Sequence, residues 1–445
     1  MTYLETIRYL ESFINYEQIP SYPYKESLKL ERIKDFLADI GNPQDSLRCI
    51  HIAGTKGKGS TCVFITYILR QAGYKVGLYT SPHLSDFRER IRILNCESQT
   101  PNSKPDFEGM ITEDELIDLV ERLKPSIEKY NKNSKYGPLS FFEVYTSSAF
   151  VYFQEKKVDF AVLETGLGGR LDATNTVNPL VCAITPISYE HTQKLGNTLK
   201  EIVTEKAGII KNQKSIVISA PQEKEVMEVI RNKCKEVGAK LYEVGKDITC
   251  KKANGQELEI KGREEEYKNL NIRLIGEHQL INAAVAVGVI EALRSYEINV
   301  GIDSIRVGLY NTVWPGRCEV VSENPLLVLD GAQNVASACV LKEAIRENFK
   351  YKNLILVLGI SNDKDMKGIC GELSDLADEI ILTKADNPRA TEPEVLVEYC
   401  NGKKTHITRN VAEAKTLAHR IAKDQDLVLV TGSLFVVGEF GYDKT

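Results

Sequence analysis

The sequence lacks long hydrophobic runs and has little net charge. None of its apolar stretches approaches the ~20 consecutive apolar residues that a membrane-spanning helix needs. The first residues, MTYLETIRYLESF, are mixed and acidic from Glu5, unlike the apolar core of a secretion signal. The 57 basic and 62 acidic residues leave a charge of −5, without the basic excess of a nucleic-acid or anionic-membrane binder. We therefore expect neither a nucleic acid nor a membrane as partner.

Paired cysteines, repeats and low-complexity tracts are also missing. The ten cysteines are scattered singly, without a Cys-x-x-Cys pair or zinc-ligand spacing. Several, such as Cys49 and Cys182, lie in apolar runs, where cysteine behaves as a small hydrophobic residue. These features predict a reduced, cytoplasmic protein. A hydrophobic content of 42% with 27% charged residues excludes wholesale disorder.

What the sequence does contain is an alternation of short β-branched runs and helical patterns over 445 residues, which is too long for one core. Buried parallel strands read as nearly continuous apolar runs. We expect strands at 48–53, 75–80, 158–164, 180–185, 215–219, 326–330, 354–359, 379–383 and 427–431. We expect helices at 58–72, 113–130, 141–155, 199–210, 223–237, 278–293, 336–348 and 411–423. The fold class is therefore α/β, with mostly parallel sheets covered on both faces.

The alternation falls into two blocks. The stretch 296–301 interrupts it, and a second series begins near Arg317, so we expect domains at 1–297 and 298–445. Short, charged, strand-like pieces at 247–273 predict a small antiparallel insert, and residues 97–110 predict an exposed loop.

The strongest local signal is RCIHIAGTKGKGSTC at 48–62, where a strand leads through a glycine-rich turn into a helix. Gly54, Gly57 and Gly59 would let backbone N–H groups approach an anion, the N-terminus of the following helix adds positive potential, and Lys58 adds a charge. The spacing differs from the usual P-loop, because Gly59 separates Lys58 from Ser60. The alternative is a glycine-rich turn with a surface lysine. The loop by itself indicates nucleoside triphosphate binding and nothing narrower.

Three further residues carry candidate chemistry. Glu164 ends an apolar strand, where a carboxylate beside phosphates suits Mg²⁺, although it could merely cap a turn. His191 follows the next strand and is by itself as compatible with a solvated loop. Lys206 shares a helix face with apolar residues, so it is either a lysine that extends to solvent or a buried amine of lowered pKa that reacts with CO₂ to form a carbamate.

Together these segments resemble the folylpolyglutamate synthase/dihydrofolate synthase family of the Mur ligase superfamily. The motifs occur in the family's order from about residue 28 to 440: HIAGTKGKGS, YTSPHLSDFRERI, SFFEVYTSS, LETGLGGRLDATN, EKAGIIK, GEHQLINAA, WPGR, LDGAQN and TGSLFVVGEF. The resemblance implies a P-loop NTPase-like N-terminal domain and a smaller, Rossmann-like α/β C-terminal domain. It also implies an ATP-dependent ligase that converts a folate carboxylate, or that of dihydropteroate, to an acyl phosphate for attack by L-glutamate.

The resemblance also implies residue roles. ATP, a co-substrate, would be bound by Gly57, Lys58, Gly59, Ser60, Asn282, Arg317 and Asp330. Two Mg²⁺ sites would use Ser81 with Glu164 and Glu164 with His191, and Lys206 would be the carbamylated lysine. Lys58, Glu164, His191 and Lys206 would be the catalytic set. Substrate would be contacted by Arg90, Phe142, Asp172, Gln333 and Ser433. We expect a monomer.

Most of these residues have a structural alternative. Ser81 before a proline could form only a turn, and Arg90 lies in a charged run that is often a solvated face. Phe142 could be core, Ser433 could be only a helix N-cap, and Asn282 could be a satisfied polar group.

The sequence also departs from the family pattern. Gln333 stands where the family has histidine, and Glu190 replaces the usual aspartate before His191, whereas Lys56 is the eukaryotic-type residue where many bacterial members have asparagine. Gln333 leaves open a paralogue that binds nucleotide or folate without ligating. A further alternative is a ligase that acts on a nucleotide-linked muramyl acceptor, against which the folate-type GKGS argues.

Overall fold

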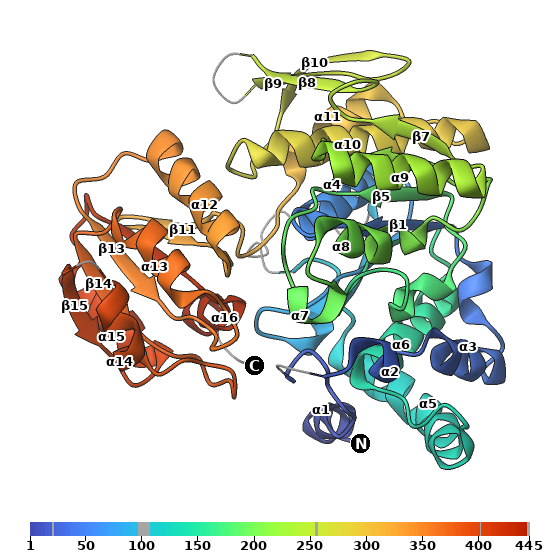
Figure 1. Ribbon diagram of the computed structural model, residues 1–445, viewed down its shortest axis with the longest axis horizontal. Coiled ribbons are helices and arrows are strands. Elements are labelled where there is room, and N and C mark those ends of the chain that lie inside the picture. Colours follow the sequence, from blue (N-terminus) through green and yellow to red (C-terminus); the bar gives the residue numbers. More distant parts are fainter. Residues whose placement is uncertain (20–21, 97–106, 254–256, 401, 443–445) are drawn as a thin grey trace. The chain divides into compact units, whose positions relative to one another are not determined.

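The computed structural model describes residues 1–19, 22–96, 107–253, 257–400 and 402–442 (Figure 1). The chain forms two compact units. Unit 1 contains Met1–Pro82, Phe87–Arg273 and Gln279–Thr312, and unit 2 contains His83–Asp86, Leu274–His278 and Val313–Thr445. Each unit is described by itself. Residues 97–106 of the expected exposed loop lie outside the described residues.

Unit 1 is built on a seven-stranded sheet of order β3-β2-β4-β1-β5-β6-β7. Only β3 is antiparallel to its neighbour; the other strands are parallel. The inner strands are buried throughout because helices cover both faces, which explains their unbroken apolar character. The strands are β1 (Cys49–Ala53), β2 (Val76–Tyr79), β3 (Ile91–Leu94), β4 (Phe160–Glu164), β5 (Val181–Ile184), β6 (Ile216–Ser219) and β7 (Lys240–Glu243).

Two hydrophobic clusters lie against one face of this sheet. One contains residues of α3, α5 and α6, and the other contains residues of α8 and α9. Thr112, Ser140 and Thr198 begin three of these helices with capping boxes, each closed by a glutamate three residues later. The helices are α1 (Tyr3–Glu11), α2 (Tyr24–Ser27), α3 (Leu30–Asp39), α4 (Lys58–Gln71), α5 (Glu113–Asn133), α6 (Phe141–Glu155), α7 (Thr192–Leu195), α8 (Leu199–Lys206), α9 (Lys224–Val237), α10 (His278–Ala292) and α11 (Ile302–Asn311).

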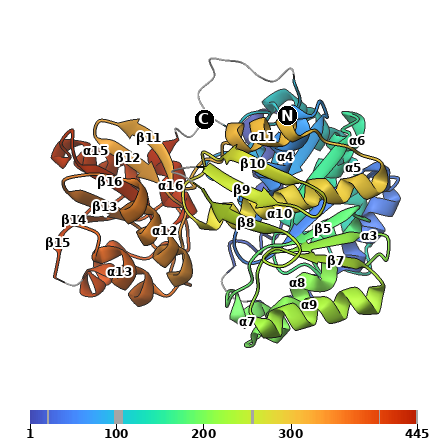
Figure 2. The same ribbon diagram turned by 90° about the horizontal axis from the view of Figure 1, so that it is seen from above.

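The predicted antiparallel insert is confirmed. Strands β8 (Thr249–Lys252), β9 (Glu257–Lys261) and β10 (Glu266–Asn271) form a separate sheet of order β10-β9-β8 (Figure 2). Its turn is held by Glu291 of α10, a buried carboxylate that accepts hydrogen bonds from the Tyr267 hydroxyl and the Arg263 backbone N–H.

Unit 2 is a six-stranded sheet of order β11-β12-β16-β13-β14-β15, parallel except for β11. Its strands are β11 (Glu319–Glu323), β12 (Leu326–Leu329), β13 (Leu354–Leu358), β14 (Glu379–Leu382), β15 (Lys404–Ile407) and β16 (Leu427–Thr431). Its helices are α12 (Val335–Asn348), α13 (Met366–Ser374), α14 (Pro393–Leu396), α15 (Val411–Ile421) and α16 (Leu434–Gly441). The α/β class, with two mostly parallel sheets, is confirmed.

The units divide later than the sequence suggests. The sequence pattern places the boundary at 297/298, whereas unit 1 extends to Thr312. The reason is α11, which packs against α4 so closely that a Cβ on Gly308 would lie 2.5 Å from the Cα of Ile68. A close helix–helix contact of this kind depends on a partner more than 200 residues away, which local periodicity does not reveal.

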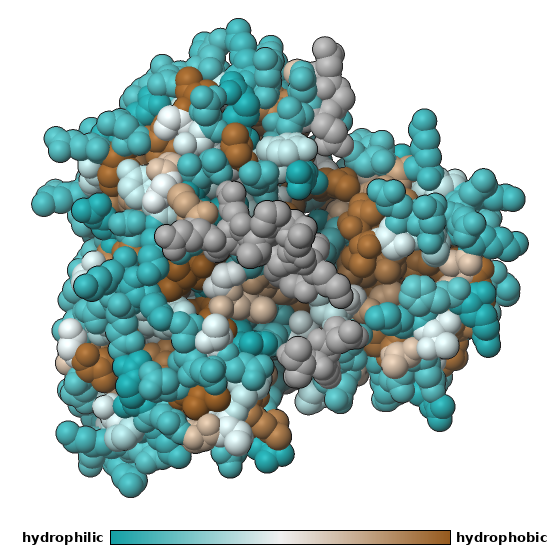
Figure 3. All heavy atoms as spheres, turned by 180° about the vertical axis from the view of Figure 1, so that it is seen from behind, coloured by the Kyte–Doolittle hydropathy of each residue, from teal (hydrophilic) through white to brown (hydrophobic). Residues whose placement is uncertain are grey.

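The outer surface is polar. Hydrophilic side chains predominate on the face shown in Figure 3, as the charged fraction of the sequence leads one to expect. Among the described residues, no helix combines the length and the apolar character that crossing a bilayer requires.

Candidate active site

The glycine-rich turn joins β1 to α4 in a conformation that depends on glycine. Gly57 is the N-cap of α4 with φ +79°, a left-handed backbone that side chains disfavour. A Cβ on Gly57 would lie 2.2 Å from Oδ1 of Asn282, whose own amide donates to Gln279 Oε1 at 2.9 Å. The tertiary structure therefore brings Asn282 of α10 against the turn.

The start of α4 has the features of an anion site. The first N–H groups of a helix have no partner within the helix and carry its positive potential. Lys58 and Gly59 belong to this first turn, and Ser60 follows as a buried residue. The Lys58 ammonium lies 3.7 Å from the Glu164 carboxylate. Backbone donors, a cation and a carboxylate thus meet at one edge of the sheet.

Glu164 is placed by strand order. It is the last residue of β4, which lies between β1 and β2, and it pairs in register with Ile52 just before the glycine turn. Its side chain is only 5% exposed and accepts a hydrogen bond from the Ser81 backbone N–H at 3.3 Å. The structure thereby brings together Ser81, Glu164 and Lys58, as the family resemblance implies.

The loop of residues 186–190 is hydrogen-bonded to the glycine-rich turn. The backbone N–H groups of Thr55 and Lys56 donate to Pro186 O at 3.0 and 3.2 Å. The Thr55 hydroxyl donates to Ser188 O at 3.2 Å, and the Ser188 N–H donates back to that hydroxyl at the same distance. These bonds fix the loop that leads to His191.

Lys56, in the glycine-rich turn, and Glu190, in the loop that is hydrogen-bonded to it, contact each other. The Lys56 ammonium lies 3.9 Å from the Glu190 carboxylate, a partly exposed ion pair of modest energy. His191 comes next, with an exposed side chain and a left-handed backbone (φ +52°) at the start of α7. Within the described parts of the chain, no three His, Cys, Asp or Glu side chains form a metal-binding group. The metal role of His191 therefore stays a prediction.

Lys206 is buried rather than extended to solvent. It ends α8, is 4% exposed, and donates from Nζ to Gly54 O in the glycine turn at 2.8 Å. Burial lowers the pKa of Lys206 to about 7, the charge of Lys58 acts in the same direction, and Glu190 opposes both. Roughly half of the amine is therefore neutral at pH 7, which is the form that reacts with CO₂.

Replacing Lys206 with methionine should remove a pH-dependent part of stability. Between pH ~7 and ~10.5 the unfolded lysine holds a proton that the folded one has lost. Wild-type stability should therefore gain a contribution from Lys206 as pH rises through this window, and Lys206→Met should lack it. Urea unfolding at pH 6.5 and 9.5 in CO₂-free buffer measures this. The exposed Lys200→Met on the same helix is the control, and identical pH profiles for Lys206→Met and wild type would contradict the prediction.

Asp172 and Phe142 both contact the glycine-rich segment that follows Glu164. Asp172 is 3% exposed and accepts hydrogen bonds from the Leu167 N–H at 2.9 Å and the Thr174 hydroxyl at 2.5 Å. Burial raises the pKa of Asp172, and the hydrogen bonds from Thr174 and the backbone oppose that rise. The Phe142 ring packs over Gly166 so closely that a Cβ there would lie 2.7 Å from Cζ.

Arg90 does not lie on a solvated face. It is 1% exposed, donates to both carboxylate oxygens of Glu17 at 2.9 and 2.6 Å, and lies 5.2 Å from the Phe141 ring centre. In this arrangement Arg90 binds the N-terminal segment, and its contact with substrate stays a prediction. Sequence reasoning missed Glu17, because nothing local links it to a residue 73 positions away.

In unit 2, Asp330 directly follows β12, and Arg317 lies just before β11. Asp330 accepts hydrogen bonds from the Cys318 and Ala332 N–H groups, both at 2.8 Å. Burial raises the pKa of Asp330, while the charge of Arg317 lowers it. Arg317 is held against Gly331, where a Cβ would lie 2.6 Å from the guanidinium. The Asp330 carboxylate and the Arg317 guanidinium therefore lie close together in unit 2.

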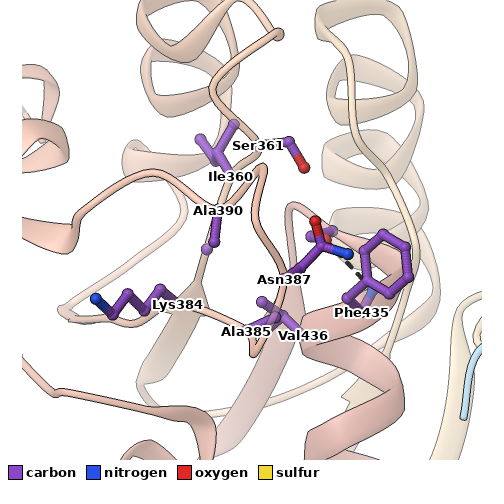
Figure 4. Close-up of a pocket in the computed structure, with 10 residues that line it drawn as sticks. Ile360, Ser361, Lys384, Ala385, Asn387, Ala390, Phe435 and Val436 are labelled. Atoms are coloured by element: carbon purple, nitrogen blue, oxygen red, sulfur yellow. Dashed lines mark hydrogen bonds between the residues drawn. The ribbon is translucent and has the colours of Figure 1, made fainter. Parts of the chain in front are cut away.

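Ser433 lines a small, open hollow at the carboxyl ends of β13, β14 and β16 (Figure 4). Its hydroxyl also caps α16, accepting from the Phe435 N–H at 3.3 Å, so the N-cap role is present. In Figure 4 the Asn387 amide lies beside the Phe435 ring, whereas the Lys384 ammonium points away, toward its partner Glu392 at 2.7 Å. Asn387 was not predicted, although the Asp-Asn-Pro-Arg segment a few residues after β14 could have indicated it.

Comparison with known proteins decides the family. A Mur ligase middle-domain model matches residues 131–290, and a Mur ligase glutamate-ligase-domain model matches residues 316–434. The chain is 35% identical to the dihydrofolate synthase/folylpolyglutamate synthase of Bacillus subtilis over 92% of this chain and 93% of that protein. The chain belongs to the folylpolyglutamate synthase/dihydrofolate synthase family. The resemblance stated from the motifs is confirmed.

Related enzymes have the same fold. An Escherichia coli family member (FolC), solved with ADP and DHPP, superposes with a TM-score of 0.83 at 30% identity, covering 99% of this chain and 96% of that one. The Mycobacterium tuberculosis folylpolyglutamate synthase, solved with ADP, gives a TM-score of 0.86 at 29% identity, covering 100% and 99%.

Gln333 lies in the turn before α12 of unit 2. It precedes Asn334, the N-cap of α12, and its backbone N–H donates to the Ser337 hydroxyl at 3.2 Å. The turn is therefore held by backbone and by Ser337, and the residue 333 side chain is not needed to form it. A glutamine here changes the side chain that the turn presents without changing the turn.

Proposed function

We propose that this protein is an ATP-dependent ligase that adds L-glutamate to the carboxylate of a folate through an acyl phosphate. The observation that carries the proposal is the meeting of Lys58, Glu164 and the glycine turn at the start of α4. This arrangement suits phosphoryl transfer to a carboxylate, where catalysis is mostly positioning and charge neutralisation. Dihydropteroate, which has the same kind of carboxylate, is the second acceptor that we propose to test.

In unit 1, the chain's own groups would act on the nucleotide. Gly57, Gly59 and Ser60 would donate N–H groups to the phosphates, and Lys58 would neutralise the transferred phosphoryl group. Asn282, against the turn, would contact the nucleotide.

The carboxylate donors fit magnesium, since hard oxygen ligands beside phosphates are what it prefers. Ser81 with Glu164, and Glu164 with His191, would hold two ions. Bound Mg²⁺ would supply charge stabilisation to the phosphate oxygens. A carbamate on Lys206 would add an anion to the second site, and the buried amine described above supports this role.

We propose that Arg317 and Asp330 contact the nucleotide and that Gln333 and Ser433 contact glutamate. Arg90, Phe142 and Asp172 would contact the folate. We further propose that the enzyme is monomeric. We also propose that it is cytoplasmic, since its unpaired cysteines favour a reducing compartment.

The deciding experiment incubates the protein with ATP, Mg²⁺ and L-glutamate, offering tetrahydrofolate and dihydropteroate in separate reactions. Mass analysis should show acceptors extended by glutamate, with ADP released in proportion. Extension of tetrahydrofolate alone would exclude the dihydrofolate synthase activity. ADP release without any extended product would contradict ligation.

Gln333 motivates the alternative of a paralogue that binds but does not ligate. If the glutamine amide keeps the family histidine's contact by hydrogen bonding, Gln333→His should retain turnover within a few fold. Gln333→Ala should raise the KM for glutamate about tenfold, the cost of one hydrogen bond of ~1.4 kcal/mol. Initial rates against glutamate concentration check this. Gain of activity only in Gln333→His would favour the non-ligating paralogue.

A further inference from the structure

A buried chain of hydrogen bonds leads from the centre of the unit 1 sheet to Asp172. His51, in the middle of β1, is fully buried, and its Nε2 lies 2.8 Å from the Thr174 hydroxyl. Thr174, in the short 3-10 helix η4 (Ala173–Thr176), contacts Asp172 Oδ1 through both its hydroxyl, at 2.5 Å, and its backbone N–H, at 3.0 Å. Neither His51 nor Thr174 is among the proposed nucleotide, metal or substrate contacts.

The direction of each hydrogen bond follows from proton counting. The Leu167 N–H, the Thr174 N–H and the Thr174 hydroxyl all face the Asp172 oxygens, which favours the ionised carboxylate. An ionised carboxylate only accepts, so the Thr174 hydroxyl gives its single proton to Asp172. The threonine oxygen must then accept from His51, which places the imidazole proton on Nε2. Burial, with a smaller effect of the Lys211 charge, lowers the pKa of His51 to about 3, so the ring stays neutral. Nδ1 is fully buried and has no hydrogen-bond partner in the described structure.

The second oxygen of Asp172 is fixed from the other side. Oδ2 accepts from the Leu167 N–H at 2.9 Å, in the glycine-rich segment that begins with Gly166 under the Phe142 ring. Both carboxylate oxygens are therefore held, one by Thr174 and one by the loop. Rotation of the carboxylate would break at least one of these bonds.

We propose that His51 and Thr174 are positioning residues that fix the orientation of Asp172 for the folate acceptor. This inference rests on the proposed function in one respect, that Asp172 contacts the acceptor. His51 acts from behind the carboxylate, through Thr174, and touches no substrate. Disturbing the chain should therefore affect acceptor binding, while nucleotide binding at the turn before α4 is unchanged.

The test compares three threonine variants. Thr174→Val removes the hydroxyl with little change of shape, Thr174→Ser keeps it, and Thr176→Val removes a buried hydroxyl of the same turn that bonds Ala173 O instead of Asp172. We expect Thr174→Val to raise the KM for tetrahydrofolate about tenfold, the loss of one charge-assisted hydrogen bond. The KM for ATP should stay within twofold, and Thr174→Ser and Thr176→Val should resemble wild type. An unchanged acceptor KM in Thr174→Val, or an equal rise for ATP, would overturn the proposal.

A measurement on the unmodified chain guards against misfolded variants. Nitrogen-15 NMR of labelled histidines should show a neutral ring that is protonated on Nε2 and does not titrate down to pH 5, and loss of this signal in His51→Gln assigns it to His51. If the signal lost in His51→Gln came from a ring protonated on Nδ1, or from one that titrates near pH 6.5, the chain of hydrogen bonds would be refuted. If wild type extended no acceptor, the proposed ligase would be wrong, and tetrahydrofolate binding by calorimetry to the same variants would then decide the role of Thr174.

Discussion

Glu164→Gln should reduce ligation about a thousandfold or more while leaving the protein folded. The change removes one negative charge where Lys58 approaches within 3.7 Å and where the magnesium ions are proposed to bind. Losses of 10²–10⁵-fold are typical when a group that stabilises a phosphoryl-transfer or oxyanion transition state is removed. Initial rates of ADP release with saturating tetrahydrofolate and glutamate measure the effect.

The matched control is Glu228→Gln, the same substitution on the exposed face of α9. It should leave the rate unchanged. Binding of ADP without magnesium should also persist in Glu164→Gln, because the backbone donors at the start of α4 are intact. Unchanged turnover in Glu164→Gln would exclude the proposed metal role of this carboxylate.

Gly57→Ala should weaken ATP binding about a hundredfold. A side chain at φ +79° costs ~1–2 kcal/mol, and the contact at 2.2 Å between the new Cβ and Asn282 Oδ1 adds ~1–3 kcal/mol of overpacking. The free protein can relieve this cost by moving the turn, but the turn must return to its glycine conformation to bind ATP. A total of ~3 kcal/mol then corresponds to about two factors of ten in affinity. Isothermal titration with a non-hydrolysable ATP analogue measures it.

Two further variants separate the cost of backbone strain at residue 57 from that of steric overlap with Asn282. Gly73→Ala, just beyond the other end of α4, also has positive φ (+96°), but its Cβ would meet nothing within 4 Å, so it should reduce stability slightly and leave ATP affinity intact. In an Asn282→Ala background the collision is absent, and the additional effect of Gly57→Ala should shrink to the strain alone. Strictly additive effects of Gly57→Ala and Asn282→Ala would show that the two residues do not meet.

Much of the fold was predictable because its signals are local. The inner strands, such as β1, β4 and β16, are continuous apolar runs, and most large helices show clear periodicity and caps. The predicted helix at 199–210 shows the limit of such patterns. α8 ends at Lys206 and continues as the 3-10 helix η5 (Ala207–Ile209), because the chain must turn to place Lys206 against the glycine turn.

Elements whose stability comes from distant partners were not predicted. β3 was not predicted, because it overlaps the charged run that contains Arg90. Arg90, just before this strand, and Arg92, within it, are nevertheless among the largest fully buried side chains. β7 is an edge strand with a polar sequence, and α11 is stabilised by its contact with α4. In each case the decisive energy is long-range packing or ion pairing, which does not appear in a local window.

The amino-acid order alone determined the two α/β blocks, the glycine turn and the strand end that delivers Glu164, since covalent neighbours set backbone preference and apolar periodicity. Only the tertiary structure decided that Lys206 is desolvated, that Arg90 is paired with Glu17 and that His51 reaches Asp172 through Thr174. Burial and hydrogen bonding are properties of groups brought together from distant segments. The charge state of a side chain depends on those neighbours, so it is established only when the chain has folded.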